Sequence, residues 1–228
     1  MTTTKYDPNR AALERLCAET IAQQLQAVIA RRGSVVFAVP GGRSVSGIFS
    51  ELASRSIDWQ DVKIFVVDER QVSLTSDQSN FKLLSHYLIE PLQKLNKLSP
   101  DNIFPYDAAQ GIEKYQQQLE AVGAKFDVVL LSAGEDGHVA GLFPNHHSIE
   151  STAPFFLTMT DSPKPPPERM TTSKRLLAAA TYGSLLFFGD GKKQALKNYQ
   201  DQTLGVTDCP AKIVDLVEQA TVYTDNTV

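Results

Sequence analysis

Apolar residues follow two alternating patterns along this chain. Short continuous apolar runs predict buried strands, and longer stretches with three- and four-residue spacing predict amphipathic helices. The runs are Val35–Val39, Ile64–Val67, Phe126–Leu131, Phe155–Met159 and Leu185–Phe188. The helical stretches are Leu13–Ile29, which ends at Gly33, Ser79–Ile89, Ile112–Val122, about Thr172–Ala180, and Ala211–Ala220, which precedes a short strand at Val222–Tyr223.

Strands that alternate with helices from Ser34 almost to the end predict an α/β fold, an open, mostly parallel sheet with helices on both faces. The first three strands are expected to form the centre of the sheet. Neither an internal repeat nor a low-complexity linker interrupts the pattern. We therefore expect residues 1–228 to form one compact domain.

Composition and charge limit the kinds of partner and the cell compartment that we expect for this chain. With 228 residues, 42% of them apolar, the chain can bury a core without disulfides or metal ions. The 22 basic and 26 acidic residues give a net charge of −4, which disfavours a nucleic-acid surface. No stretch approaches the ~18 apolar residues that span a bilayer, and the N-terminus has no apolar signal core. Two cysteines, Cys17 and Cys209, fit a reducing compartment. We expect a soluble, cytoplasmic protein.

Polar clusters follow the predicted strands, at the edge where open α/β sheets bind ligands. Pro40–Ser44 contains two glycines, which let backbone N–H groups approach an anion, although an ordinary strand-to-helix turn has the same composition. Asp68–Arg70 places three charges after a strand, either at a ligand rim or in a solvated turn. Gly189–Lys193 offers a second anion contact, or simply lysines exposed at the start of a helix.

Gly134–His138 holds an imidazole two residues from a carboxylate. His138 can accept a proton from water near neutral pH, and Asp136 can orient the ring or contact substrate. A hydrogen-bonded structural histidine is the alternative. His146 and His147 suggest a metal site with Asp136, but neighbouring histidines in a loop lack the spacing of known sites. No metal is predicted.

The loop Asp161–Arg169 is rich in proline and holds two cations, Lys164 and Arg169. Proline restricts the loop, and arginine can bind phosphate through two parallel hydrogen bonds. A polyproline recognition segment is the alternative. The sequence therefore favours an anion contact in this loop.

In this order, the clusters resemble the 6-phosphogluconolactonase family of the oxidative pentose phosphate pathway. The matching blocks span about residues 35–196 and are Pro40–Ser44, Val67–Arg70 with Ser79–Asn80, Gly134–His138 with Leu142–Pro144, Asp161–Pro166 with Arg169 and Thr171, and Gly189–Lys192. The family is similar to glucosamine-6-phosphate deaminase, which has a catalytic glutamate shortly after its histidine. This chain has Leu142–Pro144 there, without an acid.

The resemblance implies a Rossmann-like fold and hydrolysis of 6-phospho-D-glucono-1,5-lactone to 6-phospho-D-gluconate without a cofactor. It implies that His138 is the base, that Asp136 orients it or touches substrate, and that Arg70 stabilises the carbonyl oxygen. The expected substrate and phosphate contacts are Gly41, Gly42, Arg43, Ser44, Asp68, Lys164, Arg169 and Lys192. The alternatives are a sugar-phosphate isomerase or deaminase, and a non-catalytic sugar-phosphate-binding domain. The sugar-phosphate lactone is the expected partner, and the chain is expected to be a monomer or homodimer.

Overall fold

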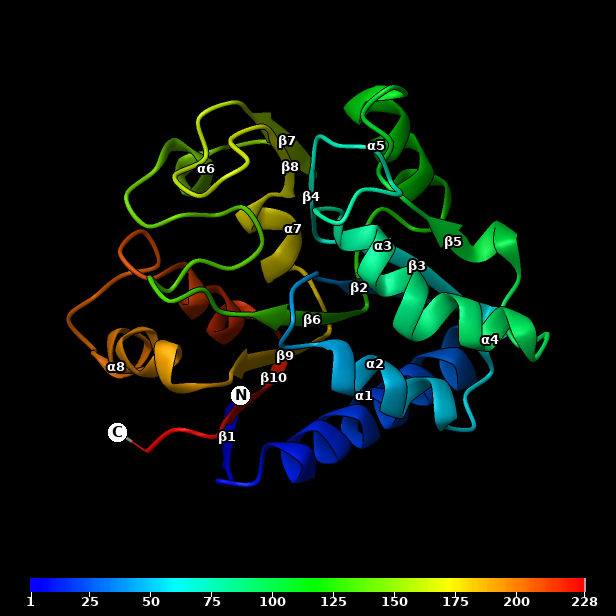
Figure 1. Ribbon diagram of the computed structural model, residues 1–228, viewed down its shortest axis with the longest axis horizontal. Helices are drawn as coiled ribbons and strands as arrows, with labels where there is room; N and C mark the ends of the chain where they lie inside the picture. Colours follow the sequence, from blue (N-terminus) through cyan, green and yellow to red (C-terminus); the bar gives the residue numbers. More distant parts are fainter. Residues whose placement is uncertain (228) are drawn as a thin grey trace.

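The computed structural model describes residues 1–227, and its strands form two sheets (Figure 1). The larger sheet is parallel throughout, as predicted, in the order β1-β10-β9-β6-β2-β3-β5. Its strands are β1 (Thr2–Tyr6), β2 (Val35–Val39), β3 (Val62–Val66), β5 (Ile103–Phe104), β6 (Val128–Ser132), β9 (Tyr182–Phe187) and β10 (Gln219–Thr224). The smaller sheet is antiparallel and consists of β4 (Asp68–Arg70), β8 (Arg169–Thr172) and β7 (Phe156–Met159).

Helices connect most of these strands. They are α1 (Arg10–Arg32), α2 (Ser46–Ser54), α3 (Asn80–Leu84), α4 (Glu90–Lys94), α5 (Gly111–Ala121), α6 (His147–Glu150), α7 (Lys174–Ala178) and α8 (Lys193–Gln200). A π-helical turn, η2 (Ser85–Ile89), joins α3 to α4, and short 3-10 helices are η1 (Trp59–Asp61), η3 (Pro100–Asn102), η4 (Asp190–Lys192) and η5 (Pro210–Leu216). Within residues 1–227, no helix is both long enough and apolar enough to cross a membrane.

Helical segments cover both faces of the larger sheet, as predicted. On β9, the side chain of Ser184 neighbours that of Cys17 in α1. A Cβ on the preceding Gly183 would lie 3.2 Å from Val214 of η5. Neighbouring residues of a strand point to opposite faces, so α1 and η5 pack on opposite sides. The buried apolar side chains of both layers form one continuous core.

The centre of the sheet differs in part from the prediction. Strands β2 and β6 are central, as expected. The third central strand is β9 rather than β3, because β3 lies next to the edge strand β5. All six residues of β9 are buried, because the strand pairs with β6 on one side and β10 on the other. The predicted strand at Phe155–Met159 forms, but as β7 of the antiparallel sheet.

The predicted helix over Ala211–Ala220 is wrong. A 3-10 helix ends at Leu216, and Ala220 belongs to β10. Pairing with β9 and β1 on both edges, and burial of Val222 and Tyr223, outweigh the helical preference of this stretch. The edge strand β1, which is threonine-rich and largely exposed, carries no apolar pattern and was not predicted.

The order of the strands creates a switch point. From β2 the chain first adds β3 and β5 on one side, and later β6, β9 and β10 on the other. In open α/β sheets, ligands bind outside the carboxyl ends of the strands at such a point. Here the carboxyl ends of β2 and β6 lead into Pro40–Ser44 and Gly134–His138.

Candidate active site

A cleft of about 860 Å³ lies at this switch point. Among the residues that the structure describes, its lining includes all the predicted site residues except Asp136, namely Gly41, Gly42, Arg43, Ser44, Asp68, Arg70, His138, Lys164, Arg169 and Lys192. Segments that are distant in the sequence therefore meet around one space. Arg10, Asn80, Glu135 and Phe188 also line the cleft, although they were not among the predicted site residues.

Asp136 does not itself line the cleft, but it contacts the ring of His138. Its Oδ1 lies 2.5 Å from Nδ1 of His138 and accepts the His138 backbone N–H at 3.2 Å. Burial raises the pKa of Asp136, but the hydrogen bonds and charge of His138, together with the charge of Lys164, bring it well below its usual value. An ionised carboxylate at Nδ1 favours the tautomer whose Nε2 carries a lone pair. The sequence left two roles open for Asp136, and this geometry favours orientation of the ring.

The lowered pKa of Asp136 makes a testable contribution to stability. The folded chain keeps this carboxylate ionised at a pH where the unfolded chain has taken up the proton, so its stabilisation is present at neutral pH and is lost as pH falls below about 4. We expect the free energy of unfolding to fall more steeply toward low pH for the wild type than for Asp136→Asn. Urea titrations between pH 6 and 3.5 measure the free energy of unfolding of both chains. A constant difference between the two chains would contradict the prediction.

Close packing fixes the ring of His138 on its other sides. A Cβ on Gly134 would lie 2.0 Å from Cε1 of His138, so only glycine fits there. The ring of Phe143 lies 4.8 Å from that of His138, centroid to centroid. The imidazole is therefore held in one orientation, half-buried at the edge of the cleft.

Asp68–Arg70 forms strand β4 rather than a solvated turn. Glu69 is almost fully buried and accepts hydrogen bonds from the N–H groups of Arg70, Asn80 and Phe81 and from the Ser79 hydroxyl, each at 2.8 to 2.9 Å. Burial raises the pKa of Glu69, while the three backbone hydrogen bonds oppose that rise. Both carboxylate oxygens are occupied, so Glu69 organises the site and leaves Asp68 and Arg70 to face the cleft.

Arg70 keeps donors available for a ligand. Its Nη1 donates to the carbonyl of Gln78 at 2.6 Å, whereas its buried Nε has no hydrogen-bond partner in the part of the chain that is described. In the register of the small sheet, Arg70 lies opposite Arg169. Two guanidinium groups therefore flank the same end of the cleft.

The loop after β2 passes close to Asn80. A Cβ on Gly41 would lie 1.9 Å from Oδ1 of Asn80, whose amide donates to the backbone and side-chain oxygens of Asp68 at 2.9 and 3.1 Å. Glycine is required for this approach. Asn80 therefore connects the Gly41–Gly42 loop to Asp68, and its contacts position both of them.

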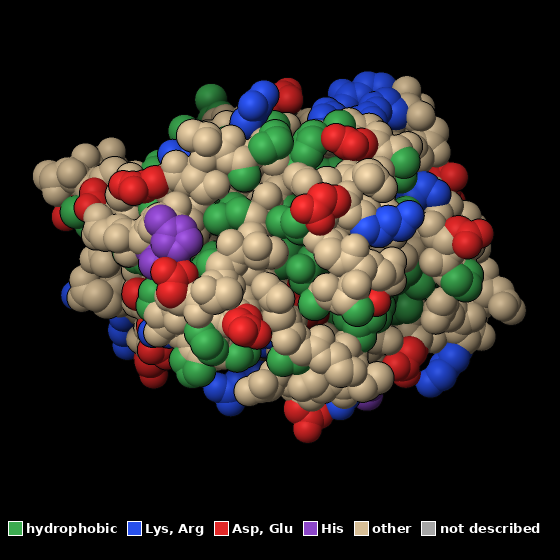
Figure 2. Space-filling model, turned by 90° about the horizontal axis from the view of Figure 1, so that it is seen from above, with side chains coloured by type: hydrophobic (Ala, Val, Ile, Leu, Met, Phe, Trp, Pro, Cys, Tyr) green, Lys and Arg blue, Asp and Glu red, His purple; other side chains and the backbone are tan. Residues whose placement is uncertain are grey.

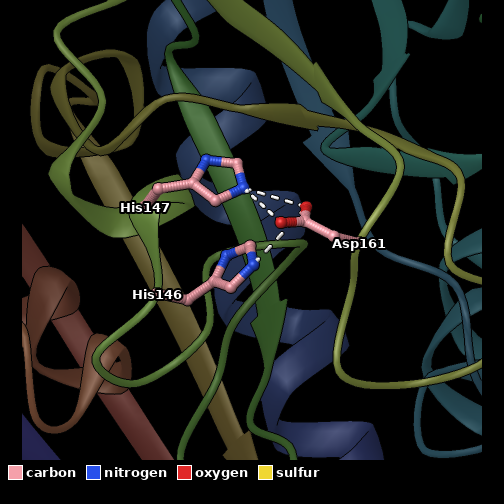
Figure 3. A group of neighbouring side chains, drawn as sticks. All are labelled: His146, His147 and Asp161. Carbon is pink, nitrogen blue, oxygen red and sulfur yellow. Dashed lines mark hydrogen bonds and ion pairs between the residues drawn. The ribbon is translucent and has the colours of Figure 1, made fainter.

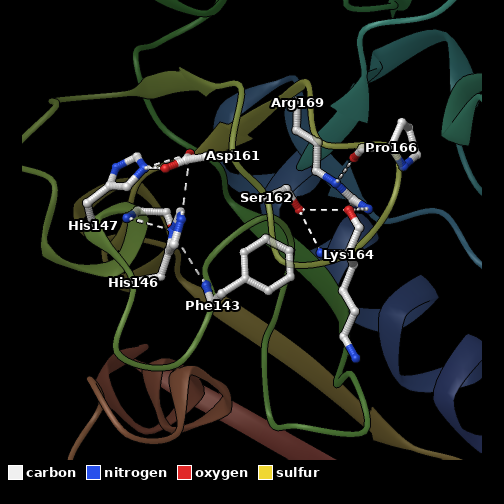
Figure 4. A network of polar contacts seen from close by, with 9 residues as sticks. Phe143, His146, His147, Asp161, Ser162, Lys164, Pro166 and Arg169 are labelled. Carbon is white, nitrogen blue, oxygen red and sulfur yellow. Dashed lines mark hydrogen bonds and ion pairs between the residues drawn. The ribbon is translucent and has the colours of Figure 1, made fainter.

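The sequence places Arg169 in the proline-rich loop, whereas in the structure it is buried at the start of β8. Its Nε donates to the carbonyl of Pro166 and its Nη2 to that of Lys164, each at 3.1 Å (Figure 4). Nη2 also donates to the carbonyl of Pro165 at 3.0 Å. Burial lowers the pKa of Arg169. The guanidinium therefore shapes the proline-rich loop, and its Nη1, which makes no hydrogen bond within residues 1–227, is left for an anion.

Three further cations surround the cleft. The Nζ of Lys164 lies 3.8 Å from Oδ2 of Asp136, and partial burial lowers the pKa of Lys192. Arg10, at the start of α1, places its guanidinium 5.2 Å from the ring centroid of Phe188. Its Nη2 donates to the carbonyl of Arg43 at 3.4 Å. The local charge is thus strongly positive, although the whole chain is slightly acidic.

The two neighbouring histidines have a different partner from the one considered in the sequence. His147 lies 2.9 Å from a carboxylate oxygen of Asp161, and His146 lies 3.6 Å from the same oxygen. Asp136 instead contacts His138. The combination of His146 and His147 with Asp136 is therefore wrong.

Fold and cleft together define a Rossmann-like α/β protein in which an oriented histidine faces a cleft lined by several cations. The family model described as "Glucosamine-6-phosphate isomerases/6-phosphogluconolactonase" matches residues 8–223, and the chain belongs to this family. The resemblance stated from the motifs is confirmed.

Individual relatives agree with this assignment. The chain is 35% identical over 195 residues to "Probable 6-phosphogluconolactonase 2" of Oryza sativa subsp. japonica, covering 78% of this chain and 70% of that protein. It is 33% identical to the 6-phosphogluconolactonase of Mycobacterium leprae, covering 77% and 76%. The crystal structure of a 6-phosphogluconolactonase from Shewanella baltica superimposes with a TM-score of 0.86 at 28% identity, over 98% of this chain and 97% of that one.

Proposed function

We propose that this chain hydrolyses 6-phospho-D-glucono-1,5-lactone to 6-phospho-D-gluconate, the second step of the oxidative pentose phosphate pathway. The observation that carries the proposal is the Asp136–His138 pair at the edge of a cleft lined by several cations. Relatives that share a third of the sequence are named for the same reaction. Fold, site chemistry and similarity thus favour one activity.

The mechanism uses groups already in place. Nε2 of His138 accepts a proton from water as the water oxygen attacks the lactone carbonyl carbon. The charge that develops on the carbonyl oxygen is stabilised by Arg70, a contribution of about 3 kcal/mol. When the tetrahedral intermediate collapses, the bond to the ring oxygen breaks and His138 returns the proton to that oxygen. Asp136 stabilises the imidazolium between these two steps.

The phosphate occupies the cationic part of the cleft in this proposal. The N–H groups of Gly41 and Gly42 contact its oxygens, and Arg43 and Ser44 lie on the same loop. The charges come from Lys164, Arg169 and Lys192, together with Arg10, which sequence reasoning missed. Asp68 accepts hydrogen bonds from sugar hydroxyls.

Lys192→Ala is expected to raise KM for the phosphorylated lactone by about 10- to 100-fold, because a hydrogen bond to a charged group contributes roughly 1.5–3 kcal/mol. The matched control is Lys193→Ala. Lys193 is the next residue, is exposed and pairs with Asp190 at 2.8 Å outside the cleft. Steady-state kinetics should show an unchanged KM for this control. Equal effects of the two substitutions would remove Lys192 from the phosphate site.

A deaminase is the nearest alternative enzyme. That reaction uses a carboxylate after the histidine, and this chain places the ring of Phe143 against His138 instead. An apolar neighbour supports ester hydrolysis, which needs one base and one oxyanion partner. Absence of ammonia release from glucosamine 6-phosphate is the expected result.

The decisive assay follows opening of freshly generated 6-phosphogluconolactone with and without the chain. Unphosphorylated gluconolactone is the control substrate. We expect acceleration of the phosphorylated lactone alone. An unchanged spontaneous rate would overturn the proposal, and binding without turnover would favour the non-catalytic sugar-phosphate-binding domain.

The proposal includes a cytoplasmic location, a small-molecule partner rather than nucleic acid, and a monomeric or homodimeric state. Cys17 and Cys209 are free buried thiols, as a reducing compartment maintains them. The positive charges described above gather in a cleft of small-molecule size rather than along an exposed stripe.

A further inference from the structure

A group of titratable side chains outside the cleft has no part in the proposed reaction. His146 and His147, where α6 begins, face Asp161 of the proline-rich loop (Figure 3). One nitrogen of each histidine and one carboxylate oxygen all lie within 4.8 Å of one another. No other three His, Cys, Asp or Glu side chains within residues 1–227 come together in this way.

The distances match the requirements of a small divalent ion. Oδ1 of Asp161 lies 2.9 Å from Nε2 of His147 and 3.6 Å from Nε2 of His146. Tetrahedral zinc, with bonds of about 2.0–2.1 Å to nitrogen and oxygen, holds neighbouring ligand atoms about 3.3 Å apart. The observed distances lie on either side of this value. Small side-chain rotations would therefore suffice to place these ligand atoms around one ion.

His146 is already oriented for coordination. Its Nδ1 lies 3.0 Å from the hydroxyl of the buried Ser148, which accepts the Phe143 N–H at 3.1 Å. If Nδ1–H donates to this hydroxyl, Nε2 carries the lone pair that a metal needs, as in many metal-binding histidines. That Nε2 is buried and makes no hydrogen bond within the described chain. In the competing tautomer, Nδ1 accepts the Ser148 N–H at 3.2 Å and Nε2 carries the proton. Zinc binding at Nε2 would select against this tautomer.

The other two ligands are open to solvent. The side chains of His147 and Asp161 are 55% and 61% exposed. Figure 2 shows histidine side chains beside acidic ones on the surface of the face seen from above. An ion can therefore enter without unfolding of the loop, and water can supply a fourth ligand.

We propose that His146, His147 and Asp161 bind one divalent transition-metal ion, with zinc as the best match. Two imidazoles and a carboxylate suit zinc better than magnesium or calcium, which prefer oxygen ligands. The ion would join α6 to the loop that carries Lys164 and leads into Arg169 at the start of β8. It would stabilise this loop and take no part in the hydrolytic step, so the inference goes beyond the proposed function.

The test is titration of the full, untagged, chelator-treated chain with Zn²⁺ by calorimetry, and with Co²⁺ by absorption spectroscopy. We expect one ion per chain and the visible bands of tetrahedral cobalt. His147→Ala and Asp161→Asn should each weaken Zn²⁺ binding at least tenfold. The matched control is His86→Ala, which removes an exposed histidine elsewhere and should leave the affinity unchanged.

Thermal unfolding gives a second readout that does not depend on lactone hydrolysis. Zn²⁺ should raise the Tm of the wild type and of His86→Ala, but not that of His147→Ala. Circular dichroism checks that each variant is folded. Failure of the wild type to bind Zn²⁺ would overturn the proposal. Binding that survives both His147→Ala and Asp161→Asn, or that is lost in His138→Ala, would place the ion elsewhere and would also overturn it.

Discussion

His138→Ala is expected to lower kcat for 6-phosphogluconolactone by about 10²- to 10⁴-fold, the usual contribution of a positioned general base. KM should change little, because the phosphate contacts lie on other residues. The variant removes Nε2, which is held toward the cleft by the 2.5 Å contact between Nδ1 and Asp136. Steady-state kinetics, corrected for spontaneous opening of the lactone, measure both constants.

His86→Ala is the matched control for this experiment and should retain wild-type kcat, because its side chain is exposed and lies outside the active-site cleft. The kcat of Asp136→Asn should lie between those of His138→Ala and His86→Ala, since the imidazole ring remains but loses its ionised partner. Full activity of His138→Ala would transfer the role of base to Asp68. Glu69 could not take that role, because both of its oxygens already accept hydrogen bonds.

The position of the site was predictable because parallel strands end at one edge of the sheet. Gly41, His138 and Lys192 each follow an apolar run, so their convergence required only the fold class. The role of Asp136 was left open, because two residues of spacing do not specify which way a carboxylate points. The hydrogen bond to Nδ1 depends on the turn that Gly134 and the neighbouring backbone make.

Other features depend on packing that no local pattern encodes. Arg10 precedes the first predicted helix and resembles any solvated cation at a helix start, yet packing of α1 brings it to Phe188 and the cleft. The helix expected over Ala211–Ala220 failed because the stretch ends in β10, which begins at Gln219 and pairs with a strand on each side. Asp161 joins His146 and His147 only because the proline-rich loop folds against the start of α6, which places Asp161 beside His147, 14 residues earlier in the chain.

Glu69→Ala is expected to lower the free energy of unfolding by about 3–5 kcal/mol, because it removes a buried carboxylate that accepts four hydrogen bonds. The substitution leaves four donors without an acceptor, the N–H groups of Arg70, Asn80 and Phe81 and the Ser79 hydroxyl. Each unsatisfied buried group costs roughly 1–3 kcal/mol, and part of that cost is relieved by water. Urea unfolding followed by circular dichroism measures the loss.

Glu69→Gln separates this hydrogen-bonding role from simple loss of volume. Its amide oxygen can replace Oε1 and accept from Arg70 and Asn80, while its NH2 group replaces Oε2. The Ser79 hydroxyl can then accept instead of donate, so the Phe81 N–H alone is left unsatisfied. We therefore expect a smaller loss than for Glu69→Ala. The control Glu120→Ala, on the exposed side of α5, should stay within about 0.5 kcal/mol of the wild type. Equal losses for the alanine and glutamine variants would show that the four donors do not set the stability of this corner of the cleft.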